Sequence, residues 1–96
     1  MTVKVVADNY LRADAVDRFI AAAQELIVQT HDKDAGCIAY DLYRDKADPL
    51  HLTVIEEWAS QEALDAHIAS EHFTRLFPEF NAAAAKPGLI TVYEPV

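Results

Sequence analysis

Hydrophobic and polar residues first alternate along the chain and then recur at helical spacing. The alternation over residues 2–8 predicts a strand in which both faces are partly apolar. Apolar side chains then recur at helical intervals, which predicts a helix over about residues 15–30, with Asp14 as its N-cap. The apolar face of that helix consists of these residues: Val16, Phe19, Ile20, Ala23, Ile27 and Thr30.

Two further strands are predicted in the middle of the chain, where they form a hairpin. A turn at residues 35–36 precedes a strand over residues 38–44, and a turn at residues 47–49 precedes a strand over residues 50–58. Neither strand has a purely polar face, although a sheet with one face in water alternates more cleanly. We therefore expect the second face of the sheet to be covered by another subunit.

The next segment is a helix that carries a histidine on its apolar stripe. Ser60 is the predicted N-cap of this helix, and Ser70 is a second candidate N-cap ten residues later. Leu64, His67 and Ile68 share one face because they lie three and four residues apart. The imidazole of His67 is therefore expected beside apolar side chains.

A second apolar stripe and a strand complete the chain. Pro78 lacks the backbone N–H that a helix interior needs, so a break or kink is expected there. Residues 82–85 are predicted to continue the helix, residues 86–88 to end it, and residues 89–94 to form the last strand. The stripe itself consists of Phe73, Leu76, Phe77 and Phe80.

The order of these elements predicts the fold class. Strand, helix, strand, strand, helix and strand in succession are typical of the α+β, ferredoxin-like split βαβ fold (β-α-β-β-α-β), which has an antiparallel sheet with helices on one face. The uncovered face invites a second sheet, which would give a dimeric α+β barrel. A chain of 96 residues predicts a single domain over residues 1–96.

Composition indicates which molecules the protein binds and where it is located. Hydrophobic residues make up 52% of the chain, and dimerisation would bury the excess. The formal charge of −8 argues against nucleic acid and anionic membranes. We expect a cytoplasmic protein because no apolar run approaches the length of about 18 residues that spans a membrane, and the first residues lack a signal-peptide core.

Metal-binding and nucleophilic motifs are not predicted. Cys37 is the single cysteine, which excludes an intrachain disulfide. His67 and His72 lie five residues apart, whereas a zinc-binding helix pair has a spacing of about four. The chain also has no glycine-rich phosphate loop and no nucleophile elbow.

Short motifs along the whole chain occur together in one known family. The chain resembles the antibiotic biosynthesis monooxygenase family, and within it the small YgiN-like quinol monooxygenases. One departure is visible, since the acidic residue before the glycine is usually Glu in that family. The matching positions are Asp34, Gly36-Cys37, Tyr40, Asp48-Pro49, Glu56, Trp58, Ala63-Leu64, His67, Ser70 and His72-Phe73.

The resemblance implies oxygenation of a small hydroquinone or phenolic aromatic with O2, by a homodimer and without a metal or flavin cofactor. It does not fix the substrate, because members of the family act on different molecules. One alternative is an isomerase of a small, sugar-phosphate-like metabolite, which would need Arg12, Arg44 or Arg75 in its cavity. Another is a non-enzymatic ligand-binding or stress-response module, whose cavity would be filled by its own side chains.

Three residues are candidates for the chemistry itself. His67 is the first candidate for the base because imidazole titrates nearest neutral pH, although it can equally bond a core carbonyl. Asn9 matches a position at which oxygenating members of the family often place an amide in the cavity, but it can instead close the strand in a turn. Trp58 can stack on a flat ring and donate its N–H, or simply fill the core.

The remaining candidates would contact substrate. Glu56 can orient His67 or the substrate, or it can pair with Arg44 or Arg75 in a structural network. Tyr40 shares a face with apolar neighbours, so it either packs in the core or reaches a ligand with its hydroxyl. Three further residues complete the candidate substrate-binding set: His51, His72 and Phe73.

Overall fold

The computed structural model describes residues 1–96, which form four strands, three α-helices and one 3-10 turn. None of the helices combines the length and apolarity that crossing a membrane requires. Along the chain the elements are β1 (Val3–Leu11), η1 (Ala13–Ala15), α1 (Val16–Lys33), β2 (Cys37–Arg44), β3 (His51–Trp58), α2 (Gln61–Ile68), α3 (Glu71–Ala83) and β4 (Ala84–Tyr93).

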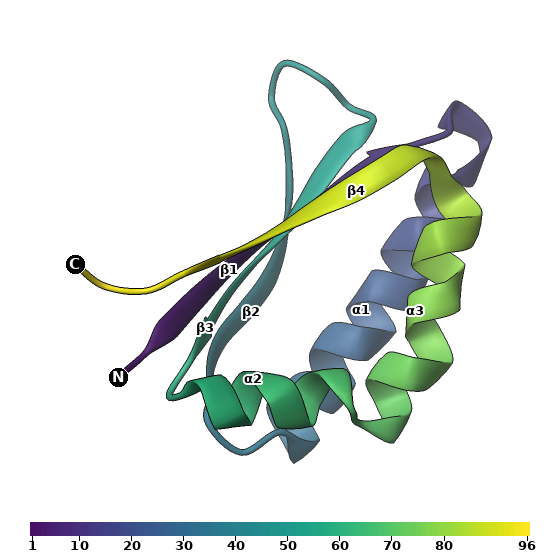
Figure 1. The fold of residues 1–96 in the computed structure, drawn as a ribbon. Helices are drawn as coiled ribbons and strands as arrows, with labels where there is room; N and C mark the ends of the chain where they lie inside the picture. The colour runs from purple at the N-terminus through teal and green to yellow at the C-terminus, as the bar shows by residue number, and fades with distance from the viewer.

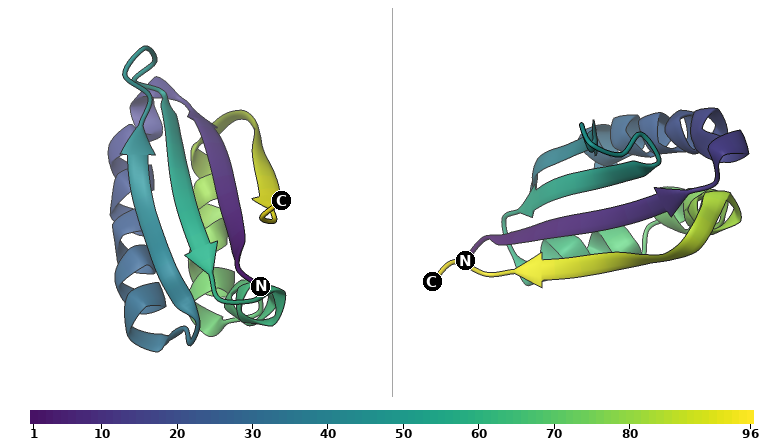
Figure 2. Two further views of the ribbon diagram at one scale, coloured as in Figure 1. Left: turned by 90° about the vertical axis from the view of Figure 1, so that its left-hand side faces the viewer. Right: turned by 90° about the horizontal axis from the view of Figure 1, so that it is seen from above.

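The strands form one open antiparallel sheet in the order β2-β3-β1-β4. All three helices lie against the same face of this sheet, and the other face carries no helix (Figure 1; Figure 2). This arrangement is the ferredoxin-like α+β fold that the order of elements predicted, and the prediction of fold class is confirmed.

The hydrophobic core lies between the sheet and the helices. Leu52, Val54 and Trp58 of β3 are buried, and they pack in one cluster with Phe19 and Leu26 of α1. Residues of β3 that are two positions apart share this helix-facing side, as the pleat of a strand requires. The even-numbered residues of β3 therefore point toward the helices, and the odd-numbered residues point toward the bare face of the sheet.

The bare face of the sheet, called the outer face below, exposes large apolar side chains. Ile55 of β3 is 43% exposed, and Leu89 of β4 is 57% exposed. Tyr43 of β2 and Tyr93 of β4 are also about half exposed. Apolar side chains thus spread across three strands of a face on which no helix packs.

The first helix begins differently from the sequence prediction. Asp14 does not cap it, because the single turn η1 comes first and places Ala15 at the N-cap position, with no side-chain hydrogen bond. Asp14 instead accepts a hydrogen bond from Nε of Arg12 at 3.2 Å. The serine caps are as predicted: Ser60 accepts from the backbone N–H at position 63, and Ser70 accepts from that at position 73.

The helix break expected at Pro78 does not occur, since α3 runs from Glu71 to Ala83. Pro78 lies on the exposed side of α3, and so does Thr74, whose carbonyl loses its helical donor to the proline. Water can satisfy a carbonyl on that side of a helix. Burial of the opposite side of α3 holds the remaining turns against the core.

The last strand begins earlier than predicted. Residues 84–85 were predicted to continue the helix and residues 86–88 to end it. All five belong to β4, because this segment pairs with the second half of β1. The pairing is irregular there: Leu89 lies opposite Asp8 and Lys86 lies opposite Tyr10, so two residues of β4 face a single residue of β1. An edge-strand bulge of this kind accommodates Pro87, which cannot donate to the ladder.

Candidate functional site

Two adjoining hollows lie between the helix-facing side of the sheet and α3, and together they are called the cleft below. Each has a volume of about 280 Å³, and four residues line both of them. The apolar lobe is lined otherwise by apolar side chains and His67. The amide lobe adds Asn9 and Asn81 at its polar end. The shared residues are Glu56, Phe73, Phe77 and Ile90.

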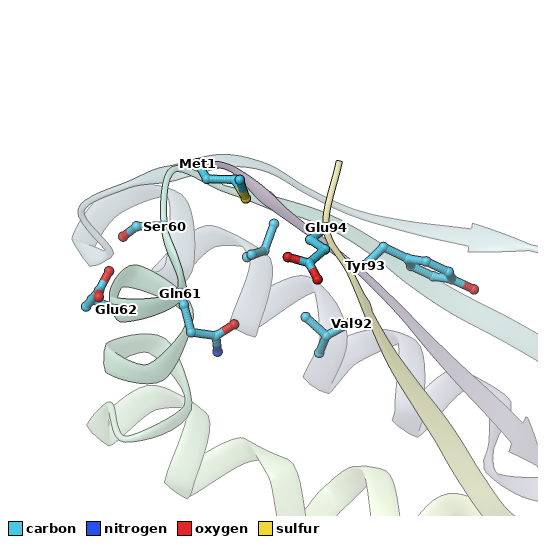
Figure 3. A pocket seen from close by; sticks show the side chains of 8 residues that line it. Met1, Ser60, Gln61, Glu62, Val92, Tyr93 and Glu94 are labelled. Atoms are coloured by element: carbon cyan, nitrogen blue, oxygen red, sulfur yellow. The ribbon is translucent and has the colours of Figure 1, made fainter. Parts of the chain in front are cut away.

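A third hollow of about 450 Å³ lies between the two ends of the chain and the first turn of α2 (Figure 3). Its polar residues are Ser60, Gln61, Glu62 and Glu94, none of which is buried. The cleft, by contrast, is lined by two buried titratable side chains, Glu56 and His67. We therefore take the cleft as the candidate site.

His67 sits in the last turn of α2 with a side chain that is 1% exposed. Its Nδ1 lies 2.6 Å from Oδ2 of Asp34, while its Nε2 is buried without any hydrogen-bond partner. Burial lowers the pKa of His67 and outweighs the opposing effect of Asp34. The hydroxyl of Ser70 donates to the backbone carbonyl of His67 at 2.6 Å, which fixes the end of α2. His67 is thus a neutral, fixed imidazole at the wall of the apolar lobe.

Asp34 is the group that sequence reasoning missed. It follows the last residue of α1, where its N–H donates to the carbonyl of Thr30, and it precedes Gly36, whose φ of 84° turns the chain into β2. Its Oδ2 also lies 2.9 Å from Nε2 of His72. The signal that could have found it is its place as the acidic residue of the family motif. His72 was expected to contact substrate, but it lines neither lobe and bonds Asp34 instead.

Glu56 lies at the junction of the two lobes and is 6% exposed. Its Oε1 accepts a hydrogen bond from Nε1 of Trp58 at 2.9 Å. Burial raises its pKa to about 7, and the bond from Trp58 opposes that rise only in part. Neither expected arginine partner is present, since Arg75 pairs with Glu25 and Glu71. Glu56 is therefore a carboxyl group that exchanges its proton near neutral pH inside the cleft.

Aromatic rings surround the imidazole of His67. The rings of Trp58, Tyr40 and Phe73 have centroids 4.8, 5.0 and 5.1 Å from it. Tyr40 lines the amide lobe, and Phe73 lines both lobes. Trp58 lines neither lobe and is fully buried, and its stacking on a substrate ring stays a prediction. Its indole instead supports His67 and Glu56.

Asn9 and His51 have different positions. Asn9 lies within β1 and lines the amide lobe, and its Nδ2 donates to the carbonyls of Ala7 and Leu52 at 3.1 and 3.4 Å. His51 lines neither lobe and lies between two carboxylates, 2.7 Å from Asp8 and 2.9 Å from Asp45. His51 is an odd-numbered residue of β3 and points to the outer face, so its contact with substrate stays a prediction that this geometry does not support.

One set of residues has the composition of a metal site. Ligand atoms of Asp34, His67 and His72 lie within 4.8 Å of one another. The spacing of the two histidines did not predict this set, because the turn between α2 and α3 brings His72 back beside His67. The same atoms are, however, already within hydrogen-bond distance of one another.

Comparison with known proteins gives the family of this chain. The model of the family described as antibiotic biosynthesis monooxygenase matches residues 2–79. The chain belongs to this family. It is 33% identical to "Putative monooxygenase Rv0793" of Mycobacterium tuberculosis over 98% of this chain and 91% of that protein.

Solved structures agree with the assignment. A crystal structure described as an antibiotic biosynthesis monooxygenase is 39% identical, covers 98% of both chains and has a TM-score of 0.91. A conserved protein from Methanosarcina mazei is 35% identical, with a TM-score of 0.94 over 97% of this chain and 91% of that one. Membership of the antibiotic biosynthesis monooxygenase family therefore rests on sequence and fold together.

Proposed function

We propose that this protein is a cofactor-independent monooxygenase that oxidises a small hydroquinone or phenolic aromatic with O2 in the cleft. The observation that carries the proposal is the buried, unpartnered Nε2 of His67, whose side chain lines an apolar lobe that Glu56 also lines. A neutral imidazole nitrogen that has no hydrogen-bond partner can serve as the base, and the surrounding rings suit a flat substrate.

The chemistry needs a base, a hydrogen-bond donor and a dry cavity. His67 takes the proton of a ring hydroxyl, and protonated Glu56 donates a hydrogen bond to the oxygen that becomes negative. The anion passes one electron to O2, and the two radicals combine to form a carbon–oxygen bond. Loss of water then leaves one oxygen atom in the ring, so that a hydroquinone and O2 give a hydroxyquinone and H2O.

The other functions considered have less support. An isomerase of a sugar phosphate needs a cation, but Arg12, Arg44 and Arg75 line neither lobe. Lys86 is the one cation that lines the cleft, and its ammonium lies over the ring of Tyr10, 4.3 Å from the ring centroid, in the amide lobe. A binding module whose cavity is filled by its own side chains does not fit a cleft with two hollows of about 280 Å³.

The first test is oxygen consumption with a panel of reduced benzo- and naphthoquinols and simple phenols. Metal-free protein should consume O2 with at least one of them, and added catalase should not return half of the oxygen, because the second atom leaves as water and not as hydrogen peroxide. If catalase returns half of the oxygen, the protein is an oxidase. If no quinol or simple phenol supports uptake above the spontaneous rate, the proposal is wrong.

We also propose that the outer face binds the outer face of a second copy. Its exposed apolar side chains, Ile55 and Leu89 among them, support this pairing. Light scattering at micromolar concentration should give twice the chain mass of 10.7 kDa. The variant Ile55→Lys should be monomeric, whereas Val28→Lys, the same change at an exposed site on α1, should stay dimeric. A monomeric wild-type protein would contradict the pairing.

A further inference from the structure

One carboxylate joins two histidines where three helices meet. Asp34 follows α1, His67 lies in the last turn of α2 and His72 lies in the first turn of α3, and these helix ends lie at the same end of the molecule (Figure 1). The three side chains are 9%, 1% and 4% exposed. One oxygen atom, Oδ2 of Asp34, lies within hydrogen-bond distance of both rings.

The position of the ring proton in each histidine follows from its hydrogen-bond partner, Asp34. A carboxylate oxygen only accepts hydrogen bonds, so Nδ1 of His67 and Nε2 of His72 must be the donors. A neutral imidazole has one N–H, and a hydrogen on Nδ1 of His67 leaves a lone pair on its Nε2. This is the same nitrogen that is buried without a partner, in a ring that lines the apolar lobe.

We propose that Asp34 is the positioning residue of this site: it holds His67 as the Nδ1–H tautomer, with the lone pair of Nε2 available to the apolar lobe. This inference rests on the proposed function only in naming His67 as the base. His72 has a supporting part, because its N–H occupies the same oxygen of Asp34 and fixes the carboxylate from a second helix.

The charge of Asp34 has a second consequence during turnover. When His67 takes a proton it becomes an imidazolium, which burial in an apolar wall disfavours. The carboxylate of Asp34 at 2.6 Å stabilises that cation, as the aspartate does in a serine-protease triad. Asp34 thus sets both the direction in which the ring accepts a proton and how readily it does so.

The tautomer can be measured without substrate. We would record the ring nitrogen resonances of 15N-labelled protein near pH 7.5, with the His67 signals assigned by their loss in His67→Gln. The expected result is a protonated Nδ1 and an unprotonated Nε2 in His67, unchanged by EDTA. A proton on Nε2, or a signal that changes when EDTA removes a metal or when Zn²⁺ binds this set, would overturn the inference.

Two variants separate the oxygen atom of Asp34 from its charge. Asp34→Asn keeps one oxygen that can accept from both rings, so the tautomer should persist. Without the charge, kcat should fall about tenfold, KM should change little, and the acid limb of the pH profile should move to lower pH. Asp34→Leu removes the acceptor, and the proton of His67 should then no longer be confined to Nδ1.

A matched control makes the same chemical change elsewhere. Asp65 lies on the exposed side of α2, two residues from His67. The variant Asp65→Asn should alter neither the tautomer of His67 nor the pH profile. An acid limb that stays in place in Asp34→Asn would overturn the role of the charge. If no substrate is oxidised at all, the proposed function fails, but the tautomer measurement still decides the role of Asp34.

Discussion

Replacing His67 by alanine is expected to lower the rate of oxygen uptake about 100-fold or more. The change removes the one cleft nitrogen that is buried and free to take a proton, and loss of a positioned general base typically has this magnitude. Substrate binding should weaken less than turnover, because the rings of Phe73 and Phe77 that line both lobes remain in place. Rates of oxygen uptake with the best quinol of the panel give the measurement.

Two controls accompany this measurement. His31→Ala removes an exposed histidine of α1 that lines neither lobe and bonds only the backbone carbonyl of Tyr40, at 3.2 Å, and it should leave the rate within about twofold. Added imidazole should restore part of the lost rate in His67→Ala, because the hole left in the lobe wall admits a free base. A folded His67→Ala protein that oxidises the quinol at the wild-type rate would remove His67 from the mechanism.

Local patterns predicted the elements well, and the errors arose where distant strands or helices decide the structure. The caps at Ser60 and Ser70 depend on a hydrogen bond to a residue three positions later, so they are readable from the sequence. Residues 84–88 contain alanines that favour a helix, but pairing with β1, more than seventy residues earlier, makes them a strand. Propensity is a weak prior against such pairing.

The same distinction explains the candidate site. Glu56 and Tyr40 were placed on the apolar side of their strands by alternation, and both line the cleft. His51 and Glu56 are five residues apart on one strand, so strict alternation puts their side chains on opposite faces of the sheet, a consequence that the prediction of His51 as a substrate contact did not use. The contacts of Asp34 join residues 33 and 38 positions apart, and no periodicity reports such a contact.

Glu56→Gln is expected to change the free energy of unfolding differently at two pH values. The change at pH 8 should be more stabilising than the change at pH 4.5 by up to about 3 kcal/mol. In the folded protein the pKa of Glu56 is raised from 4.5 to about 7 by burial, so the folded state binds this proton more tightly than the unfolded state. The stability that this tighter proton binding gives the folded state is fully present below pH 4.5 and is lost as the pH rises through about 7. Glutamine has no charge to lose, while its carbonyl can still accept from Trp58.

Urea unfolding of both proteins at pH 4.5 and pH 8, at one fixed protein concentration, measures this difference. Glu62→Gln makes the same change at an exposed position in the first turn of α2, and its effect should not depend on pH by more than a few tenths of a kcal/mol. If the effect of Glu56→Gln on the free energy of unfolding is the same at both pH values, the pKa of Glu56 is the same in the folded and unfolded states, and burial does not raise it.

Loss of the proton from Glu56 should also set the alkaline limb of the pH profile of the rate. If protonated Glu56 donates to the developing oxyanion, kcat/KM of the wild type should fall as the pH rises through about 7, while the lowered pKa of His67 places the acid limb below its ordinary value of 6.5. Glu56→Gln keeps an N–H donor at every pH, so its alkaline limb should disappear while its acid limb remains. An alkaline limb that persists in Glu56→Gln would assign that limb to the substrate hydroxyl and leave Glu56 as a structural partner of Trp58.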